Sequence, residues 1–184
     1  MFQILVRDDL PVFLLMTGLY ENIRNLQDEK NLTFLYRSPR ISLGPLNLLS
    51  IEKKYQSVFN FKNDDAREMA LLTNGYAFAF QVLGFLTFKH NNNYKEALDD
   101  YRIYLEEYSY NKIWSKLSSG DKKILFGIAS SKSKKIKDIL VSCNIDSNHF
   151  NPYRKRLIDK GILSNRDRGE LKFILPLFDN YIEE

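Results

Sequence analysis

Hydrophobic periodicity in the C-terminal third of the chain predicts three helices followed by two short strands. The helices are expected over residues 118–129, 136–143 and 147–160, and the strands over residues 162–164 and 171–175. This order is typical of a winged helix-turn-helix. In that unit the second helix of the helix-turn-helix pair, here residues 147–160, can lie in a DNA major groove.

The middle of the chain predicts a helical bundle over residues 46–59, 64–72, 76–90 and 94–117. The third of these segments is apolar on nearly every side, so we expect it to be the buried centre of the bundle. The last segment should join the bundle to the C-terminal unit, with a bend near Ser109. Its expected apolar anchors are Leu98, Tyr101, Leu105, Tyr108 and Trp114.

The N-terminal part predicts a small strand region. The continuous apolar run at residues 12–17 is typical of a central strand of a parallel sheet. A helix over residues 19–28 and a short aromatic segment at residues 32–36 are expected to follow. The fold class is therefore mainly α: a helical bundle with a short strand remnant, followed by a winged helix-turn-helix.

Charge is distributed unevenly along the chain, whose formal net charge is +4. Residues 1–111 carry 12 Lys and Arg against 14 Asp and Glu, which gives −2. Residues 112–184 carry 15 against 9, which gives +6. A basic C-terminal part indicates an anionic partner, and a solvated lysine-rich surface is the alternative.

Composition excludes several classes of protein. Hydrophobic residues make up 44% and charged residues 27%, as in ordinary globular proteins. No segment has the length of uncharged apolar sequence that a transmembrane helix requires. The first nine residues lack the apolar stretch of a signal peptide, and the single Cys143 excludes an internal disulfide. We therefore expect a cytoplasmic protein without a membrane partner.

The third C-terminal helix has the donors that DNA recognition uses. Asparagine can pair with adenine edges, while arginine and lysine can contact guanine or phosphate. Arginines in the predicted wing suit phosphates or a minor groove. The candidate DNA-binding residues are Asn148, His149, Asn151, Arg154, Lys155, Arg156, Arg166, Arg168, Lys134 and Lys135. A winged unit used for protein contacts is the alternative.

The sequence offers no complete catalytic or metal site. The phosphate-binding signature G-x-x-x-x-G-K-[ST] is absent, and no nucleophile lies in a pattern with a base. Asp8 and Asp9 are interpreted as solvated loop acids, with metal ligation as the alternative. We predict no catalytic residue and no metal ligand.

Several segments resemble the C-terminal portion of prokaryotic P-loop ATPases of the AAA/STAND type. The resemblance in the winged unit lies in LSSGDKKIL (residues 117–125), NPYRKRLIDKGIL (151–163) and LPLF (175–178). Upstream, LPVFLLMTGL (10–19) resembles a late core strand and LTFLYRSPRI (32–41) the end of the nucleotide core. LTNGYA (72–77) resembles the lid motif, with Ala77 where the family often has proline.

The resemblance implies three parts: residues 1–45 as a remnant of the ATPase core, 46–116 as a lid-like bundle and 117–184 as the winged-helix domain. It implies ATP and Mg²⁺ as cofactors of a parent protein, and none for this fragment. It also implies nucleotide contacts, in that parent, from Thr17, Arg37, Arg40 and Gly75, with a surface position as the alternative for either arginine.

The sequence thus predicts a non-catalytic lid and winged-helix fragment that binds DNA. The alternative is a protein-interaction module in which the winged helix and the long helix contact a partner or a second copy of the chain. Aromatic side chains on the long helix motivate this alternative, namely Tyr101, Tyr104, Tyr108 and Tyr110.

Overall fold

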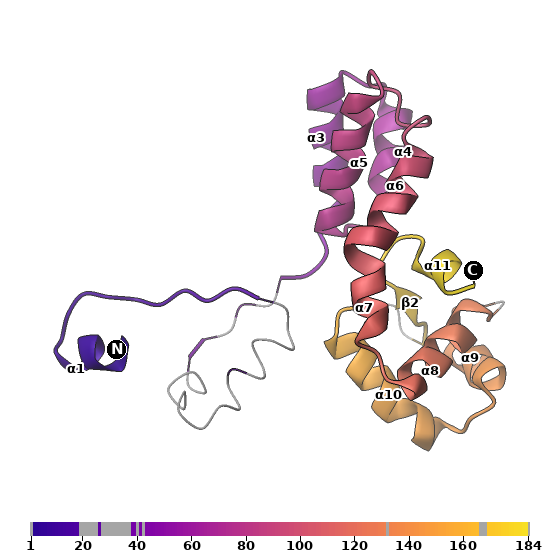
Figure 1. Ribbon diagram of the computed structural model, residues 1–184. Helices are drawn as coiled ribbons and strands as arrows, with labels where there is room; N and C mark the ends of the chain where they lie inside the picture. Colours follow the sequence, from indigo (N-terminus) through magenta and orange to yellow (C-terminus); the bar gives the residue numbers. More distant parts are fainter. Residues whose placement is uncertain are drawn as a thin grey trace. The chain divides into compact units, whose positions relative to one another are not determined.

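The computed structural model describes residues 2–18, 26, 38, 39, 41, 43–131, 133–165 and 169–183. The chain divides into two units, Met1–Ser42 and Leu43–Glu184, and each is described by itself. The described residues are mainly helical, as the sequence predicted, with one two-stranded sheet among them (Figure 1).

The first unit contains helix α1 (Phe2–Arg7), which ends in a turn where Asp9 has a φ of 55°. Residues 12–18 then follow without regular secondary structure. The predicted strand over residues 12–17 is therefore wrong for this structure, and Phe13 is 89% exposed. A strand needs a neighbour to pair its backbone groups, and the two strands of the described residues pair only with each other. The elements expected over 19–28 and 32–36 lie outside the described residues, apart from Leu26.

The second unit begins with a bundle of four helices: α3 (Leu48–Phe59), α4 (Asn63–Leu72), α5 (Ala77–Lys89) and α6 (Leu98–Leu105). Asn47 caps α3, because its side-chain oxygen accepts a hydrogen bond from the backbone N–H of Ser50 at 3.1 Å. The helix stops at Asn60, which takes the left-handed conformation. Between these ends, Ile51, Tyr55 and Phe59 repeat every four residues and form the buried side.

Helix α5 is apolar on nearly every side but is buried on only part of its surface. Leu83 and Leu86 are fully buried, whereas Phe85 is more than half exposed and Phe88 is 72% exposed. The expectation that this helix is buried throughout is therefore wrong. Close packing is confined to one side, where Gly84 lets Tyr55 approach: a Cβ at residue 84 would lie 3.3 Å from Tyr55 Cε1.

The turn between α4 and α5 connects the bundle to distant parts of the unit. Gly75 has a φ of +76°, and its carbonyl accepts a hydrogen bond from the Leu46 backbone N–H at 2.8 Å. The amide nitrogen of Asn74 donates to the carbonyls of Phe173 and Ile174, each at 2.9 Å. This one turn therefore fixes the start of the bundle and the end of the C-terminal sheet.

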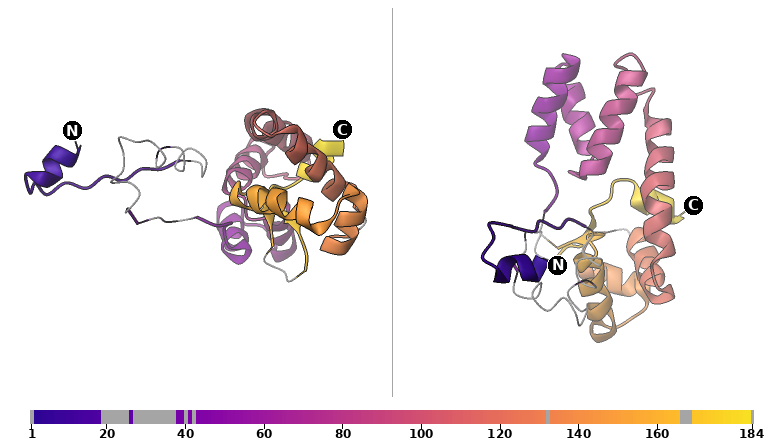
Figure 2. Two further views of the ribbon diagram at one scale, coloured as in Figure 1. Left: turned by 90° about the horizontal axis from the view of Figure 1, so that it is seen from below. Right: turned by 60° about the vertical axis from the view of Figure 1, so that its left-hand side comes forward.

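The long helix predicted after the asparagine loop is continuous but changes its winding. Helix α6 passes into a π-helical turn, η2 (Glu106–Tyr110), and then into α7 (Asn111–Ser115) (Figures 1 and 2). The wider turn takes one additional residue, so the residues after it are set back around the helix axis. Ser109 and Tyr110 become buried, while Tyr108 is 64% exposed. Tyr108 is thus not the apolar anchor that a regular α-helical spacing predicted.

The C-terminal part contains three helices and a short antiparallel sheet. The helices are α8 (Ser119–Ala129), α9 (Ile136–Cys143) and α10 (Ser147–Asp159), close to the predicted ranges. The strands β1 (Leu163–Ser164) and β2 (Lys172–Phe173) pair with Leu163 opposite Phe173. Apolar side chains from all three helices form the core, namely Ile124, Leu125, Ile128, Ile139, Phe150 and Leu157.

A last helix, α11 (Phe178–Glu183), packs against η2 and α7 through aromatic rings. The rings of Tyr110 and Phe178 meet edge to face, with centroids 4.9 Å apart. The Tyr110 hydroxyl donates to the carbonyl of Pro176, and the Tyr181 hydroxyl donates to Asn111 Oδ1 at 2.8 Å. These contacts tie the C-terminal segment to the long helix. No helix of the described residues is long and apolar enough to cross a membrane.

We expect Gly75→Ala to lower the free energy of unfolding by about 3 kcal/mol or more. The added Cβ would sit in a left-handed conformation and within 2.7 Å of the Leu46 carbonyl oxygen. Gly161→Ala is the matched control, because Gly161 also has a positive φ but nothing lies within 4 Å of an added Cβ. It should cost only about 1–2 kcal/mol. Urea unfolding measures both, and equal losses would show that the close approach to Leu46 does not matter.

Candidate nucleic-acid interface

The candidate interface is built around the start of helix α8, where Ser118 and Asp121 form a capping box. The Ser118 hydroxyl accepts a hydrogen bond from the Asp121 backbone N–H at 3.1 Å. In return, Asp121 Oδ2 accepts from the Ser118 hydroxyl at 2.9 Å and from the Ser118 N–H at 3.4 Å. The cap satisfies backbone groups that the first helical turn would leave unpaired. It also brings a carboxylate that is only 1% exposed into the protein.

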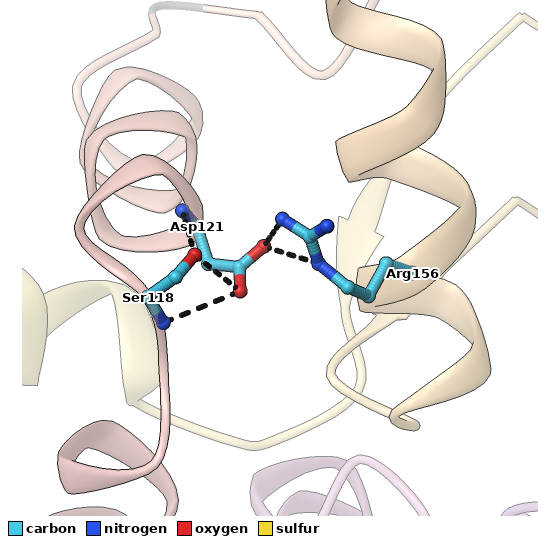
Figure 3. A network of polar contacts seen from close by, with 3 residues as sticks. All are labelled: Ser118, Asp121 and Arg156. Atoms are coloured by element: carbon cyan, nitrogen blue, oxygen red, sulfur yellow. Dashed lines mark hydrogen bonds and ion pairs between the residues drawn. The ribbon is translucent and has the colours of Figure 1, made fainter.

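Arg156 of helix α10 supplies the positive charge that this buried carboxylate needs (Figure 3). Its Nε and Nη2 both donate to Asp121 Oδ1, at 2.9 Å and 2.6 Å. The guanidinium also stacks over the Tyr153 ring, 4.9 Å from its centroid. Gly120 lets the two helices approach, because a Cβ there would lie 2.7 Å from Tyr153 Cε1. Arg156 therefore holds α10 against the start of α8.

The pKa of Asp121 reflects two opposing effects. Burial by itself raises the pKa of this carboxyl group, because desolvation disfavours the charged form. Hydrogen bonds from Arg156 and Ser118 outweigh burial, and the pKa lies below its usual value. The folded protein thus stabilises the carboxylate. This contribution is complete above the pKa of the unfolded chain and is lost as the pH falls through the lowered pKa of the folded state.

The start of helix α10 is capped by Asp146. One carboxylate oxygen accepts from the backbone N–H groups of Asn148 and His149, at 2.8 Å and 3.1 Å. The other oxygen lies 2.5 Å from His149 Nδ1. Hydrogen bonds from the His149 side chain and backbone lower the pKa of Asp146. The His149 ring, a predicted DNA contact, is therefore engaged in the helix cap.

Arg154, another predicted DNA contact, lies partly within the protein. The residue is half-buried, and its Nε is buried without a hydrogen-bond partner among the described residues. It follows Phe150 by four residues and precedes Leu157 by three, both of which are fully buried. That spacing places Arg154 on the core side of α10.

Three predicted residues share the exposed side of helix α10: Asn148, Asn151 and Lys155. Their spacing of three and four residues places them on one stripe. Within the part of the chain that the structure describes, their side chains form no hydrogen bond or ion pair, and all three are exposed. The stripe therefore presents two amides and one ammonium group to the solvent.

The other predicted basic residues lie in different settings. Lys134 Nζ lies 3.9 Å from Asp179 Oδ2 and 5.9 Å from the centroid of the Phe173 ring, so its charge is partly compensated. Lys135 is exposed at the start of α9, and its backbone forms an isolated bridge with Glu170. Arg166 and Arg168 lie outside the described residues.

The residues expected to approach a nucleotide lie in different units or outside the described residues. Thr17 is exposed in the irregular segment of the first unit, while Gly75 is buried in the turn between α4 and α5. Arg37 and Arg40 lie outside the described residues. Among the described residues, no group of three or more His, Cys, Asp or Glu side chains could hold a metal ion.

The sequence did not reveal the role of Asp121 beyond that of a helix start. A usable signal was present, because Asp121 precedes Ile124, Leu125 and Ile128 at the spacing of one helix face. An acid on a core-facing stripe needs a cationic partner. A cation that pairs with this carboxylate was therefore to be expected, and Arg156 of α10 is that cation.

Comparison with known proteins gives one finding. Residues 107–182, which run from η2 to α11, match the family model of a domain of unknown function (DUF8462). No curated protein and no solved structure shows significant similarity to the chain.

We expect Arg156→Ala to lower the free energy of unfolding at pH 7 by about 1–3 kcal/mol, because it leaves a buried carboxylate unpaired. Arg156 is itself 45% exposed, which keeps the loss below that of a fully buried pair. The deficit should shrink in acid, as the pH falls through the lowered pKa of Asp121 in the folded natural chain. Lys155→Ala is the neighbouring control and should change stability by less than about 0.5 kcal/mol. Urea unfolding across pH checks this, and a deficit that does not depend on pH would contradict the role of Asp121.

Proposed function

We propose that the C-terminal part of the chain is a winged helix-turn-helix that binds double-stranded DNA through helix α10. The order of α8, α9, α10, β1 and β2 supports this reading, because three helices followed by an antiparallel hairpin is the order of that unit. Helices α9 and α10 are joined by a short turn at residues 144–146, as in a helix-turn-helix pair. We assign this function to the cytoplasm, in keeping with the single Cys143.

The observation that carries the proposal is the exposed stripe of Asn148, Asn151 and Lys155. Asparagine amides can bond adenine edges, and a lysine can reach guanine or phosphate. The neighbouring side chains of Arg156 and His149 are instead bound to carboxylates of the protein, Asp121 and Asp146. We therefore propose fewer DNA contacts on α10 than the sequence predicted. Asn148 and Asn151 remain, and Lys155 is the cationic contact of the helix.

The charge distribution supports the same partner. Residues 112–184 have a net charge of +6, whereas the chain as a whole has +4. Phosphate neutralisation by such a surface provides affinity without sequence preference, and groove contacts then add selectivity. We propose that Arg166, Arg168 and Lys135 add phosphate contacts around the helix.

One specific observation supports the alternative function, a protein-interaction module. Of the four tyrosines that motivated it, Tyr101 and Tyr110 are buried and Tyr104 is half-buried. Tyr108 is exposed, and its ring lies 5.2 Å from that of Tyr104. This pair favours a protein contact on the long helix that is separate from the DNA-binding stripe.

We further propose that the chain corresponds to the C-terminal portion of a P-loop ATPase of the AAA/STAND type. The residue resemblance supports this relation, as does the order of a helical bundle before the C-terminal unit. ATP and Mg²⁺ would belong to the nucleotide core of the parent, where Thr17, Arg37 and Arg40 would lie nearby. The chain itself would not hydrolyse ATP, in keeping with its lack of a phosphate-binding signature.

Titration calorimetry of the full chain with Mg-ATP tests the nucleotide part of this proposal. We expect no heat of binding, because backbone amides cradle phosphates only in a loop that this sequence lacks. A dissociation constant of about 10 µM or tighter would contradict it.

Fluorescence anisotropy with a labelled mixed-sequence duplex at low salt tests DNA binding. We expect salt-dependent binding, and we expect Asn151→Ala/Lys155→Ala to weaken it about tenfold and to reduce the salt slope by about 1. Lys54→Ala removes the same charge from the exposed side of α3 and is the control. Absence of binding at about 100 µM protein would refute the proposal. Binding that the α10 variant leaves unchanged would refute the assignment to this helix.

A further inference from the structure

The outer side of the long helix carries a stripe of five residues at a spacing of four: Asp100, Tyr104, Tyr108, Lys112 and Lys116. In a regular α-helix each step of four residues advances by about 40°, so the stripe would wind around the axis. The π-helical turn η2 takes an additional residue and sets the stripe back by about 100°. All five residues therefore lie along one side of the helix, where Asp100 and Tyr104 are partly buried and the other three are exposed.

This stripe is accessible and contains unpaired charge. Tyr108, Lys112 and Lys116 are exposed, and Tyr104 is half-buried beside Tyr108. Within the described residues, the ammonium groups of Lys112 and Lys116 have no hydrogen-bond or ion-pair partner, and neither does the adjacent Asp99 carboxylate. Asp100 contacts His90 Nε2 at 2.9 Å, and its side chain remains 50% exposed.

The charges and rings of the stripe are complementary to those of a second copy that runs in the opposite direction. The acidic pair Asp99 and Asp100 lies about eight residues before Tyr108, and Lys116 lies eight residues after it. Tyr104 lies four residues before Tyr108, and Lys112 lies four residues after it. An antiparallel copy would therefore place acid opposite lysine and lysine opposite aromatic ring at both ends.

We infer that a second copy of the chain packs antiparallel against this stripe, with a two-fold axis at Tyr108. Asp100 of each copy faces Lys116 of the other, and Lys112 lies over the Tyr104 ring of the other copy. The two Tyr108 rings meet at the centre. Every contact occurs twice, as in an isologous dimer. The inference does not depend on DNA binding.

The charge pattern favours a second copy over other occupants. Among the five residues of the stripe, a basic peptide would find a carboxylate only at the acidic end, and it would be repelled by Lys112 and Lys116. An acidic peptide would meet the reverse problem at Asp99 and Asp100. Only a partner with both charges in reversed order satisfies both ends, and the chain itself has that order.

The contact of one helix with another is small for a protein interface, so the dimer should be weak. Interfaces below the standard size form transient complexes. We expect a dissociation constant of roughly 10–100 µM, which sedimentation equilibrium of the full chain can measure over a concentration series.

Paired charge reversals test the geometry. Asp99→Lys/Asp100→Lys and Lys112→Glu/Lys116→Glu each place like charges at both ends of the dimer. Each variant alone should therefore associate at least about tenfold more weakly than the natural chain. Mixed in equal amounts, the two variants carry opposite charges at both ends, so the mixture should associate more strongly than either variant alone, although one of the two Lys112–Tyr104 contacts is lost.

Lys53→Glu/Lys54→Glu, which makes the same charge change on exposed residues of α3, is the control and should leave association unchanged. Thermal melts check that each variant is folded. Should the loss of the His90 contact unfold the double aspartate variant, Lys112→Glu/Lys116→Glu alone tests the geometry, because it should still weaken association. A natural chain that stays monomeric throughout the series overturns the inference. The inference is also overturned if either charge-reversal variant associates as strongly as the natural chain, or if the mixture does not regain association.

Discussion

The arrangement of the C-terminal part depends on one buried carboxylate. Asp121 cannot remain charged inside the protein without donors, and it obtains them from Ser118 of its own cap and from Arg156 of α10. The first contact starts helix α8, and the second sets how α10 lies against it. Since Arg156 and Tyr153 lie on the side of α10 that meets α8, Asn148, Asn151 and Lys155 are left on an exposed side. The proposed DNA contact is thus a consequence of an internal electrostatic requirement.

A second constraint acts along the long helix. Tyr110 must reach the Pro176 carbonyl and the ring of Phe178, which lie beyond the last strand. A regular helix with Tyr101 and Leu105 buried would turn Tyr110 elsewhere, and the π-helical turn corrects its direction. The same turn forces Tyr108 outward and aligns it with Tyr104, Lys112 and Lys116. One local change of winding therefore serves both the internal packing and the exposed stripe.

The sequence predicted the elements whose signals are local. Ser118 and Asp121 marked the start of α8, and apolar spacing located α9, α10 and the hairpin strands to within a few residues. It did not predict features that depend on distant partners. The sequence predicted Arg156 as a DNA contact, whereas its guanidinium binds Asp121, 35 residues earlier. The exposure of Tyr108 followed from a turn that a 3.6-residue period does not represent. The apolar run at residues 12–17 has the composition of a strand, but composition does not supply a neighbouring strand.

The central claim is that the outer side of α10 contacts DNA while its inner side holds the fold together. Nuclear magnetic resonance of the isotopically labelled chain, titrated with a short mixed-sequence duplex at low salt, tests it most directly. The account predicts that the amide and side-chain signals of Asn148, Asn151 and Lys155 shift with added duplex, while the Arg156 Nε signal keeps its position. Shifts confined to other helices, or release of Arg156 from Asp121 upon binding, would contradict it.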